Sequence, residues 1–145
     1  LDFAIVSGSY LKPTLHIDNK ISLLVPKFYK KCLRETFINL LKSQLMTLLD
    51  KYIELYSNKL GLIPNKVTIK QQKSLWGSCS YRKNLNFNLA LIHLEESLIE
   101  YVVVHEICHL KHLDHSKDFW LLVEKAIPDY RIRVAELKKA HMLII

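Results

Sequence analysis

Residues 105–109 of this chain read HEICH, and a further histidine, His115, follows six positions later. Residues four apart on an α-helix project from one side and lie about 6 Å apart along the axis. His105 and His109 can therefore converge on one metal ion, and imidazole nitrogens bind Zn²⁺ at about 2.0–2.1 Å. Glu106 lies one step round the helix, which places it to take a proton from a metal-bound water rather than to bind the ion. The motif thus indicates a metal, a general base and hydrolytic chemistry together.

The sequence around the motif distinguishes a buried helix from a solvated one. Two surface histidines flanking a solvated glutamate would give the same five letters by chance. Residues 101–104 are Tyr-Val-Val-Val, however, so we expect a buried helix over about 95–113. Glu95 and Glu96 would open this helix at the positive end of its dipole. Two histidines and a glutamate buried on a helix need partners, and a metal ion supplies them.

The third ligand has three candidates close behind the motif. Catalytic zinc sites use three protein ligands and leave one position for water. His112 lies a further turn along the predicted helix, so its reach back to the metal is strained. His115 follows Asp114 at a point where the helix can end and the chain fold back, and we expect His115 to be the ligand. His112 is then a neighbour of the ligands or solvated, while Asp114 either orients an imidazole or caps the next segment.

The composition predicts a single folded domain over residues 1–145. Half of the residues are apolar, which allows a sizeable core and argues against disorder. We find no signal peptide and no run of the roughly 20 apolar residues that a membrane helix needs, so we expect no membrane partner. The chain begins at Leu1 rather than Met, and we expect a missing N-terminal portion. An odd number of cysteines without CxxC spacing predicts free thiols and a cytoplasmic location; these are Cys32, Cys79 and Cys108.

The positive charge is concentrated upstream of the motif. The chain carries a net charge of +7, and residues 61–94 hold five basic and no acidic side chains. Such a stretch could attract phosphate, nucleic acid or an acidic substrate. Aromatic side chains do not interleave with it as they do in single-strand binders, so a solvated surface is the favoured interpretation. The basic residues are Lys66, Lys70, Lys73, Arg82 and Lys83.

Hydrophobic periodicity predicts an α+β fold. Residues 10–26 alternate around a turn near 18–20, which is typical of a β-hairpin, and Gly61 and Pro64 follow a long helical pattern. The remaining predicted strands cover residues 67–70 and 85–89. The predicted helices cover residues 27–60, 95–113, 116–126 and a terminal segment after 128–130.

Several segments, taken in chain order, resemble the YgjP-like metal-dependent hydrolase family, which is related to WLM and SprT-type zincin domains. The similarity is strongest over about residues 60–135. Family members often carry Arg where this chain has Leu75, and Gly where it has Asn84, so a substrate contact by that Arg is not expected here. The matching segments are Gln72-Lys73-Ser74, Trp76-Gly77-Ser78-Cys79-Ser80, Leu85-Asn86-Phe87, and residues 101–110, 115–120 and 128–131.

The resemblance implies a minimal zincin-like domain, with a small twisted β-sheet packed against the HExxH helix and the long N-terminal helix. It implies His105, His109 and His115 as the Zn²⁺ ligands. We expect a zinc-dependent hydrolase, most simply a metallopeptidase, in which Glu106 is catalytic and the substrate is a peptide or protein. Tyr130 is a weaker candidate for stabilising an oxyanion, and packing is its favoured role.

The segments upstream of the predicted helix over 95–113 either face the substrate or pack the fold. Residues 85–89 could form an edge strand that pairs with an extended peptide. Gly77 would allow a close backbone approach or a bulge, or it makes a turn, and a serine of the 78–80 run could hydrogen-bond near the cleft. Trp76 and Phe87 could instead pack the core.

Two other functions are compatible with the same metal site. One is a metal-dependent nucleoside triphosphate pyrophosphatase, for which the basic stretch would suit polyphosphate. Against it, the chain has no glycine-rich phosphate loop, and three-histidine sites favour Zn²⁺ over Mg²⁺. The other is a SprT-like DNA-associated protease or nucleic-acid-binding module, whose DNA affinity would fall steeply with salt.

Overall fold

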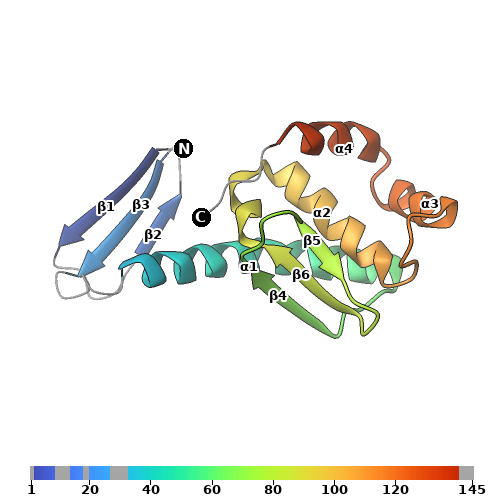
Figure 1. Cartoon of the computed structure of the whole chain (residues 1–145), viewed down its shortest axis with the longest axis horizontal. Helices are drawn as coiled ribbons and strands as arrows, with labels where there is room; N and C mark the ends of the chain where they lie inside the picture. Colours follow the sequence, from blue (N-terminus) through green and yellow to red (C-terminus); the bar gives the residue numbers. More distant parts are fainter. Residues whose placement is uncertain (1, 9–13, 18–19, 27–32, 141–145) are drawn as a thin grey trace. The chain divides into compact units, whose positions relative to one another are not determined.

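The chain has an α+β fold, as the sequence predicted. The computed structural model describes residues 2–8, 14–17, 20–26 and 33–140, and all structural statements here concern those residues. By internal contacts the chain divides into two compact units, Leu1–Gln44 and Leu45–Ile145, each with its own sheet (Figure 1). The expectation of one domain over residues 1–145 stays a prediction, because a division by contacts does not tell whether the two units fold independently.

The first unit contains a three-stranded sheet in the order β1-β3-β2. β2 (Thr14–Ile17) pairs antiparallel with β3 (Lys20–Pro26), and Ile17 lies opposite Ile21 at the end of the hairpin. This confirms the predicted hairpin, whose residues 10–13 and 18–19 lie outside the described residues. β1 (Asp2–Gly8) runs parallel to β3 and was not predicted. Its apolar residues are continuous rather than alternating, and such a run does not distinguish a strand from a buried helix.

Helix α1 (Leu33–Leu60) spans both units, and residues 27–32 of its predicted range lie outside the described part of the chain. In the second unit its buried side chains recur at steps of three and four, as predicted for an amphipathic helix. The helix ends where Gly61 adopts a positive φ of 68° and donates its N–H to the Ser57 carbonyl over 2.8 Å. The predicted stop at glycine is therefore confirmed. The buried residues of this stripe are Leu45, Leu49, Tyr52 and Tyr56.

The second unit contains a small mixed sheet in the order β4-β6-β5. β4 (Lys66–Lys70) runs parallel to β6 (Asn84–Asn88), and β5 (Gly77–Cys79) runs antiparallel to it. The prediction of an edge strand over 85–89 is wrong, because β6 is paired on both sides. Its Leu85 and Phe87 are fully buried, as a central strand requires. Of the described strands of this sheet, β4 and β5 form the edges.

A buried asparagine fixes the loop that leads into β5. Asn88, at the end of β6, donates two side-chain hydrogen bonds of 2.8 Å, to the carbonyls of Gln72 and Leu75. Its backbone N–H reaches the Trp76 carbonyl, and its side-chain oxygen accepts from Ala90 at the start of the 3₁₀ helix η2 (Leu89–His93). One side chain therefore satisfies several backbone groups that burial would otherwise leave unpaired. The loop before Gly77 is held in place as a result.

Helix α2 (Glu96–His109) lies between β5 on one side and α3 (Lys117–Ala126) and α4 (Tyr130–Lys139) on the other (Figure 1). Ten of its 14 residues are buried, which confirms a helix enclosed by the rest of the unit. It ends at His109, four residues before the predicted position 113. None of the described helices is long and apolar enough to cross a membrane.

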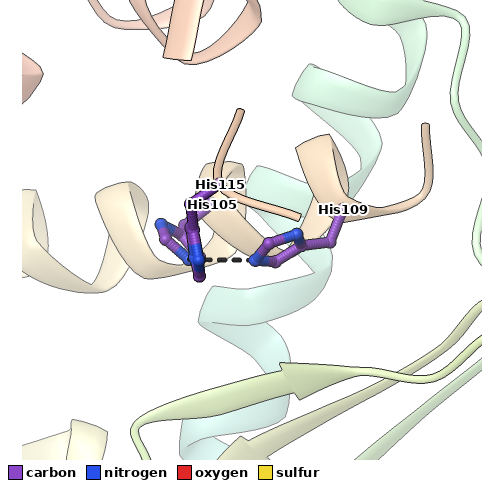
Figure 2. A group of neighbouring side chains, drawn as sticks. All are labelled: His105, His109 and His115. Atoms are coloured by element: carbon purple, nitrogen blue, oxygen red, sulfur yellow. Dashed lines mark hydrogen bonds between the residues drawn. The ribbon is translucent and has the colours of Figure 1, made fainter. Parts of the chain in front are cut away.

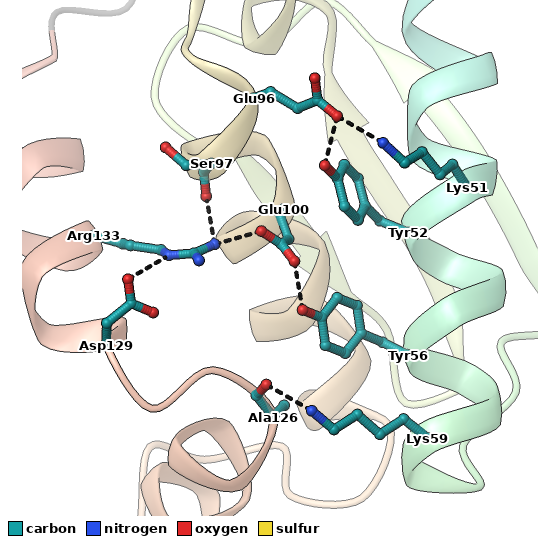
Figure 3. A network of polar contacts seen from close by, with 10 residues as sticks. All are labelled: Lys51, Tyr52, Tyr56, Lys59, Glu96, Ser97, Glu100, Ala126, Asp129 and Arg133. Atoms are coloured by element: carbon teal, nitrogen blue, oxygen red, sulfur yellow. Dashed lines mark hydrogen bonds and ion pairs between the residues drawn. The ribbon is translucent and has the colours of Figure 1, made fainter.

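Polar contacts hold α4 against α2 and α1. Figure 3 shows Glu100 of α2 accepting hydrogen bonds from the Tyr56 hydroxyl at 2.5 Å and from Arg133 of α4 at 2.6 Å. The Arg133 guanidinium also donates to the Ser97 carbonyl at 3.0 Å and pairs with Asp129 at 3.3 Å. Hydrogen bonds to charged, half-buried groups are stronger than exposed ion pairs. This network therefore fixes α4 relative to the helix that carries the HEICH motif.

Candidate metal centre

The structure brings the three predicted histidine ligands together. His105 and His109 project from α2, and His115 comes from the short connection to α3 (Figure 2). The Nε2 atom of His105 lies 3.2 Å from that of His109 and 3.1 Å from that of His115. Two donors of a tetrahedral zinc ion lie about 3.3 Å apart when each bond is about 2.0–2.1 Å. The three side chains thus fit a single metal ion at their centre.

The early end of α2 is what returns His115 to the other two histidines. The chain reverses over residues 110–116 and enters α3 at Ser116, whose side chain accepts a hydrogen bond from the Phe119 N–H. Asp114 is exposed, and its carboxylate accepts from the Ser116 N–H at 3.4 Å. Asp114 thus contacts the segment that follows it, while Ser116 is the N-cap of α3. The Asp114 carboxylate hydrogen-bonds the backbone of the turn that carries His115.

Hydrogen bonds to the far nitrogens orient two of the imidazoles. His109 Nδ1 lies 2.8 Å from the backbone carbonyl of His112, and a carbonyl can only accept, so Nδ1 carries the proton and Nε2 keeps its lone pair. His112 thus neighbours the ligands through its main chain, and its side chain is not part of the cluster. His105 Nδ1 lies 3.1 Å from the hydroxyl of Tyr101, a buried residue one turn earlier on α2. Both contacts leave Nε2 facing the centre of the cluster.

Two of the three histidines, His105 and His109, have lowered pKa values. Burial, with smaller contributions from His109 and His115, lowers the pKa of His105 to about 3. Burial also lowers the pKa of His109. Since a neutral imidazole has a free lone pair and an imidazolium does not, these two side chains are available as ligands at neutral pH.

Aromatic residues of α3 and α4 pack against the ligands. Phe119 stacks on His109 with ring centroids 4.4 Å apart, and Trp120 stacks on His115 at 5.8 Å. Tyr130 stacks in turn on Trp120 at 5.5 Å and is buried, which agrees with its expected packing role. The sequence predicted a helix over residues 116–126 but not that two of its aromatic side chains contact the histidines. No local spacing signals this contact, because it depends on how α3 packs against α2.

Glu106 is buried between helix α2 and strand β5. Its side chain is 5% exposed, and its Oε2 has no hydrogen-bond partner among the described residues. Burial raises the pKa of Glu106 to about 8. A Cβ added at Gly77 would lie 2.9 Å from both Cγ and Oε1 of Glu106. The predicted close approach at Gly77 is therefore confirmed, and the group that approaches is the expected general base.

The other residues of the Trp-Gly-Ser-Cys-Ser run have two roles: Trp76 lines a cavity, and the serines contact strand β6. Trp76 is half-buried and lines a cavity beside His105 and Glu106, whereas Phe87 packs in the core. The hydroxyl oxygens of Ser78 and Ser80 instead accept hydrogen bonds from β6, from the Asn86 side chain and the Asn84 backbone N–H. The serines therefore support the β5–β6 pairing.

The five basic side chains of residues 61–94 lie apart from the cavity beside Glu106. All five are exposed, and none is among the residues that line that cavity. The guanidinium of Arg82 contacts the ring and hydroxyl of the neighbouring Tyr81. This arrangement agrees with a solvated surface.

Comparisons with known proteins point to one class of enzyme. A model of the family described as YgjP-like, metallopeptidase domain, matches residues 4–140. The crystal structure of the metallopeptidase zymogen abylysin from Pyrococcus abyssi is 26% identical, with a TM-score of 0.55, and the match covers 66% of this chain and 99% of that chain. The metallopeptidase zymogen jannalysin from Methanocaldococcus jannaschii is 23% identical, with a TM-score of 0.50 over 65% of this chain and 91% of that chain, and shows a shared fold. No curated protein matches.

The contact between Gly77 and Glu106 generates a stability prediction. Gly77→Ala should lower the free energy of unfolding of the metal-free protein by about 1–3 kcal/mol, because the new methyl group overpacks the site. In a Glu106→Ala background the same substitution should have little effect, since the atoms that the methyl group meets are gone. Urea denaturation of the four proteins measures both values. Equal losses in the two backgrounds would contradict the contact.

The buried carboxyl group generates a pH dependence in the metal-free protein. The pKa of Glu106 is about 8 in the folded state against 4.5 for an ordinary glutamate, so the folded state binds this proton more tightly. The resulting stability is present below pH 4.5 and is lost as the pH rises toward 8. Glu106→Gln cannot ionise, so its stability advantage over wild type should grow between pH 5 and 8. Urea denaturation in chelator across this range tests it; parallel curves would exclude the raised pKa, since the histidines are common to both proteins.

Proposed function

The chain belongs to the YgjP-like metallopeptidase family, and from that premise we propose that it is a zinc-dependent peptidase that hydrolyses peptide or protein substrates. The observation that carries the proposal is the convergence of three histidine Nε2 atoms beside a buried glutamate. Three imidazole ligands with an adjacent carboxylate as general base are the arrangement of a catalytic zinc site. His105, His109 and His115 would hold the ion, and Glu106 would be the catalytic residue.

The proton transfers fall to Glu106. When bound, zinc would supply a water of lowered pKa and polarise the scissile carbonyl. The Glu106 carboxylate would accept a proton from the attacking water and later deliver it to the leaving amine. Its contact with Gly77 limits where the carboxylate can move. Burial raises the pKa of Glu106 in the metal-free protein, and a cation held by the histidines would favour its ionised, proton-accepting form.

The ligands would be oriented by groups that do not themselves bind the ion. The Tyr101 hydroxyl and the His112 carbonyl hydrogen-bond the far nitrogens of His105 and His109. Such partners fix the tautomer and ring orientation of a metal-binding imidazole. Tyr101 is therefore a positioning residue for His105 in this proposal.

Strand β5 is the edge at which a substrate could pair. It is bonded on one side to β6 and lies next to α2, with Gly77 against Glu106. An extended peptide can add to a sheet edge through main-chain hydrogen bonds. A substrate aligned in this way would bring its backbone past the general base. This role replaces the one predicted for residues 85–89.

The setting we infer is a reducing cytoplasm. Within the described part of the chain, Cys79 and Cys108 are free thiols, the second of them buried. Free thiols persist where glutathione and thioredoxin keep them reduced. The nucleotide-pyrophosphatase and DNA-associated alternatives gain no support from the described residues, because no basic side chain lines the cavity beside Glu106.

Replacing the general base separates catalysis from metal binding. Glu106→Gln should reduce cleavage of a quenched fluorescent peptide library by about 10²–10⁴-fold while zinc remains at one ion per chain. Fluorescence assays and elemental analysis of the same preparations measure the two quantities. Undiminished cleavage would refute the role of Glu106. If zinc-loaded wild type cleaves no peptide but releases pyrophosphate from nucleotides, the peptidase proposal fails in favour of that alternative.

Zinc affinity tests the ligand set and its orientation. His115→Ala should remove most of the affinity, and Tyr101→Phe should weaken it by about 10–100-fold because His105 loses its hydrogen-bond partner. His112→Ala is the matched control, since its contact with His109 is made by the main chain, which alanine retains. Competition with a chromophoric chelator gives the zinc dissociation constants of wild type and of the three variants. A loss for His112→Ala equal to that for His115→Ala would contradict the three-histidine assignment.

A further inference from the structure

The turn between β5 and β6 carries exposed side chains just beyond the end of the edge strand (Figure 1). The strand pairing continues for one residue past β5, because the Ser80 N–H donates to the Asn84 carbonyl over 3.0 Å. The Lys83 N–H then returns to the Ser80 carbonyl over 2.9 Å, which closes the turn. The residues between these contacts form an exposed loop, called here the 81–83 loop, and they are Tyr81, Arg82 and Lys83.

Lys83 occupies a backbone position that favours glycine. Its φ is 61°, in the left-handed region. A three-residue hairpin loop commonly needs one residue in this region, and glycine adopts it at the least cost. The Cβ of a lysine crowds the backbone there, so the residue lowers the stability of the turn. Retaining lysine where glycine would be more stable indicates a use for its positive charge.

The backbone of the 81–83 loop is fixed, while its charges have no acidic partner. Asn65, just before β4, donates its N–H to the Lys83 carbonyl at 2.8 Å and its side-chain amide to the Arg82 carbonyl at 2.7 Å. The Arg82 guanidinium lies beside the Tyr81 ring and donates to its hydroxyl at 3.0 Å. Among the described residues, neither Arg82 nor Lys83 forms an ion pair. The loop therefore presents two uncompensated cations from a rigid turn.

Strand β5 connects this loop to the candidate catalytic centre. Its first residue, Gly77, lies against Glu106, and its last, Cys79, leads into the turn. Successive residues of a strand are about 3.3–3.4 Å apart, so Ser80 lies roughly 10 Å along the chain from Gly77. In the described sheet β5 pairs with β6 alone, which leaves its other side without a strand partner. A peptide paired with β5 at Gly77 would reach the loop after about three to five residues.

We propose that the 81–83 loop is an exosite, a binding surface outside the catalytic centre, for acidic residues of the substrate. The proposal rests on the proposed peptidase function and names the substrate class: polypeptides with aspartate or glutamate about three to five residues from the scissile bond, on one side of it. Residues 61–94 contain no acidic side chain that would compete for Arg82 and Lys83. Charge complementarity therefore favours a carboxylate-bearing segment over a neutral or basic one.

The position of the loop favours an acidic peptide over a nucleic acid. Two cations neutralise only about two phosphates, which gives weak binding by counterion release. A peptide at the same place would also gain main-chain hydrogen bonds along β5. Lys70 is exposed too, but it lies on β4, on the far side of β6 and opposite Asn88. Three strand spacings, roughly 14 Å, separate β4 from a peptide added to β5, and this exceeds the Debye length of about 8 Å at physiological salt.

The test uses zinc-loaded protein and a core sequence that wild type cleaves in a peptide library. Matched peptides carry Asp-Asp, Asn-Asn or Lys-Lys three to five positions from the cleaved bond, on one side or the other. We expect wild type to show a kcat/KM about 3–10-fold higher for Asp-Asp than for Asn-Asn on one side only, because exposed ion pairs each contribute little. The preference should disappear at about 1 M salt, where the Debye length is about 3 Å.

Substitutions in the loop assign this preference to its charges. The double variant Arg82→Ser, Lys83→Gly should lose the Asp-Asp preference while cleaving the Asn-Asn peptide as wild type does. Lys70→Ala is the matched control, since it removes one exposed charge from the same sheet and should keep the preference. Glycine accepts the positive φ of residue 83 without strain, so Lys83→Gly alone should unfold at no lower urea concentration than wild type. A lost preference in that variant is then not a folding defect.

A binding measurement separates the exosite from the peptidase reaction. The backbone amide resonances of the metal-free protein are titrated with the Asp-Asp peptide, the Asn-Asn peptide and a single-stranded oligothymidylate. We expect the Asp-Asp peptide to shift the resonances of residues 81–83, and the double variant to weaken this binding several-fold. Because no cleavage is involved, the readout does not depend on the catalytic centre.

The outcomes of the two measurements are distinct. Cleavage without an acidic preference, or with one that survives the double variant, would overturn the exosite and leave the peptidase intact. Binding of the Asp-Asp peptide that depends on Arg82 and Lys83, without any peptide cleavage, would support the acid-binding loop and reject the peptidase. Tighter binding of the oligothymidylate than of the Asp-Asp peptide would overturn the acidic peptide as the occupant. Neither binding nor cleavage would reject both proposals.

Discussion

The contact between α2 and β5 at Glu106 and Gly77 is the constraint on which the site depends. The two elements approach so closely that a single added carbon would lie 2.9 Å from the glutamate side chain. A glutamate in this position is held between a helix and a strand rather than left free in solvent. The strand is in turn held by Asn88, which binds the loop before it and the 3₁₀ helix after it. The position of the Glu106 carboxylate therefore depends on the β4-β6-β5 sheet as much as on helix α2.

The electrostatics of the site follow from this burial. In the metal-free protein the surroundings favour neutral forms, because burial lowers the pKa of His105 and raises that of Glu106. Glu106 Oε2 has no partner in the described residues, which is an unfavourable state for a buried carboxylate. A cation held by the three histidines would reverse that balance by stabilising the ionised form nearby. The fold therefore offers neutral imidazoles as metal ligands. A bound metal ion would in turn favour the ionised form of Glu106.

The sequence predicted the parts of this site that depend on local spacing. The HEICH motif placed two imidazoles on one side of a helix, and Gly61 marked the end of α1. It did not predict features that depend on tertiary contacts. Strand β5 has three residues, too few to show alternation, and without it the alternation in β6 suggests an edge strand. Residues 110–113 are Leu-Lys-His-Leu, which suit a helix, yet the chain leaves the helix there and the His112 carbonyl turns to His109.

Successive turns of α2 carry different tasks. The first presents Glu96 and Glu100, which bond α1 and α4 through Tyr52, Tyr56 and Arg133. The next presents Tyr101 and Val102 to the cavity, and the last carries the three residues of the candidate catalytic centre on this helix. Because one rigid helix spaces its turns at about 5.4 Å, the polar anchor, the cavity wall and the candidate metal ligands keep a fixed separation. Movement of α4 would therefore change the Leu137 side of the cavity before it changed the histidine geometry.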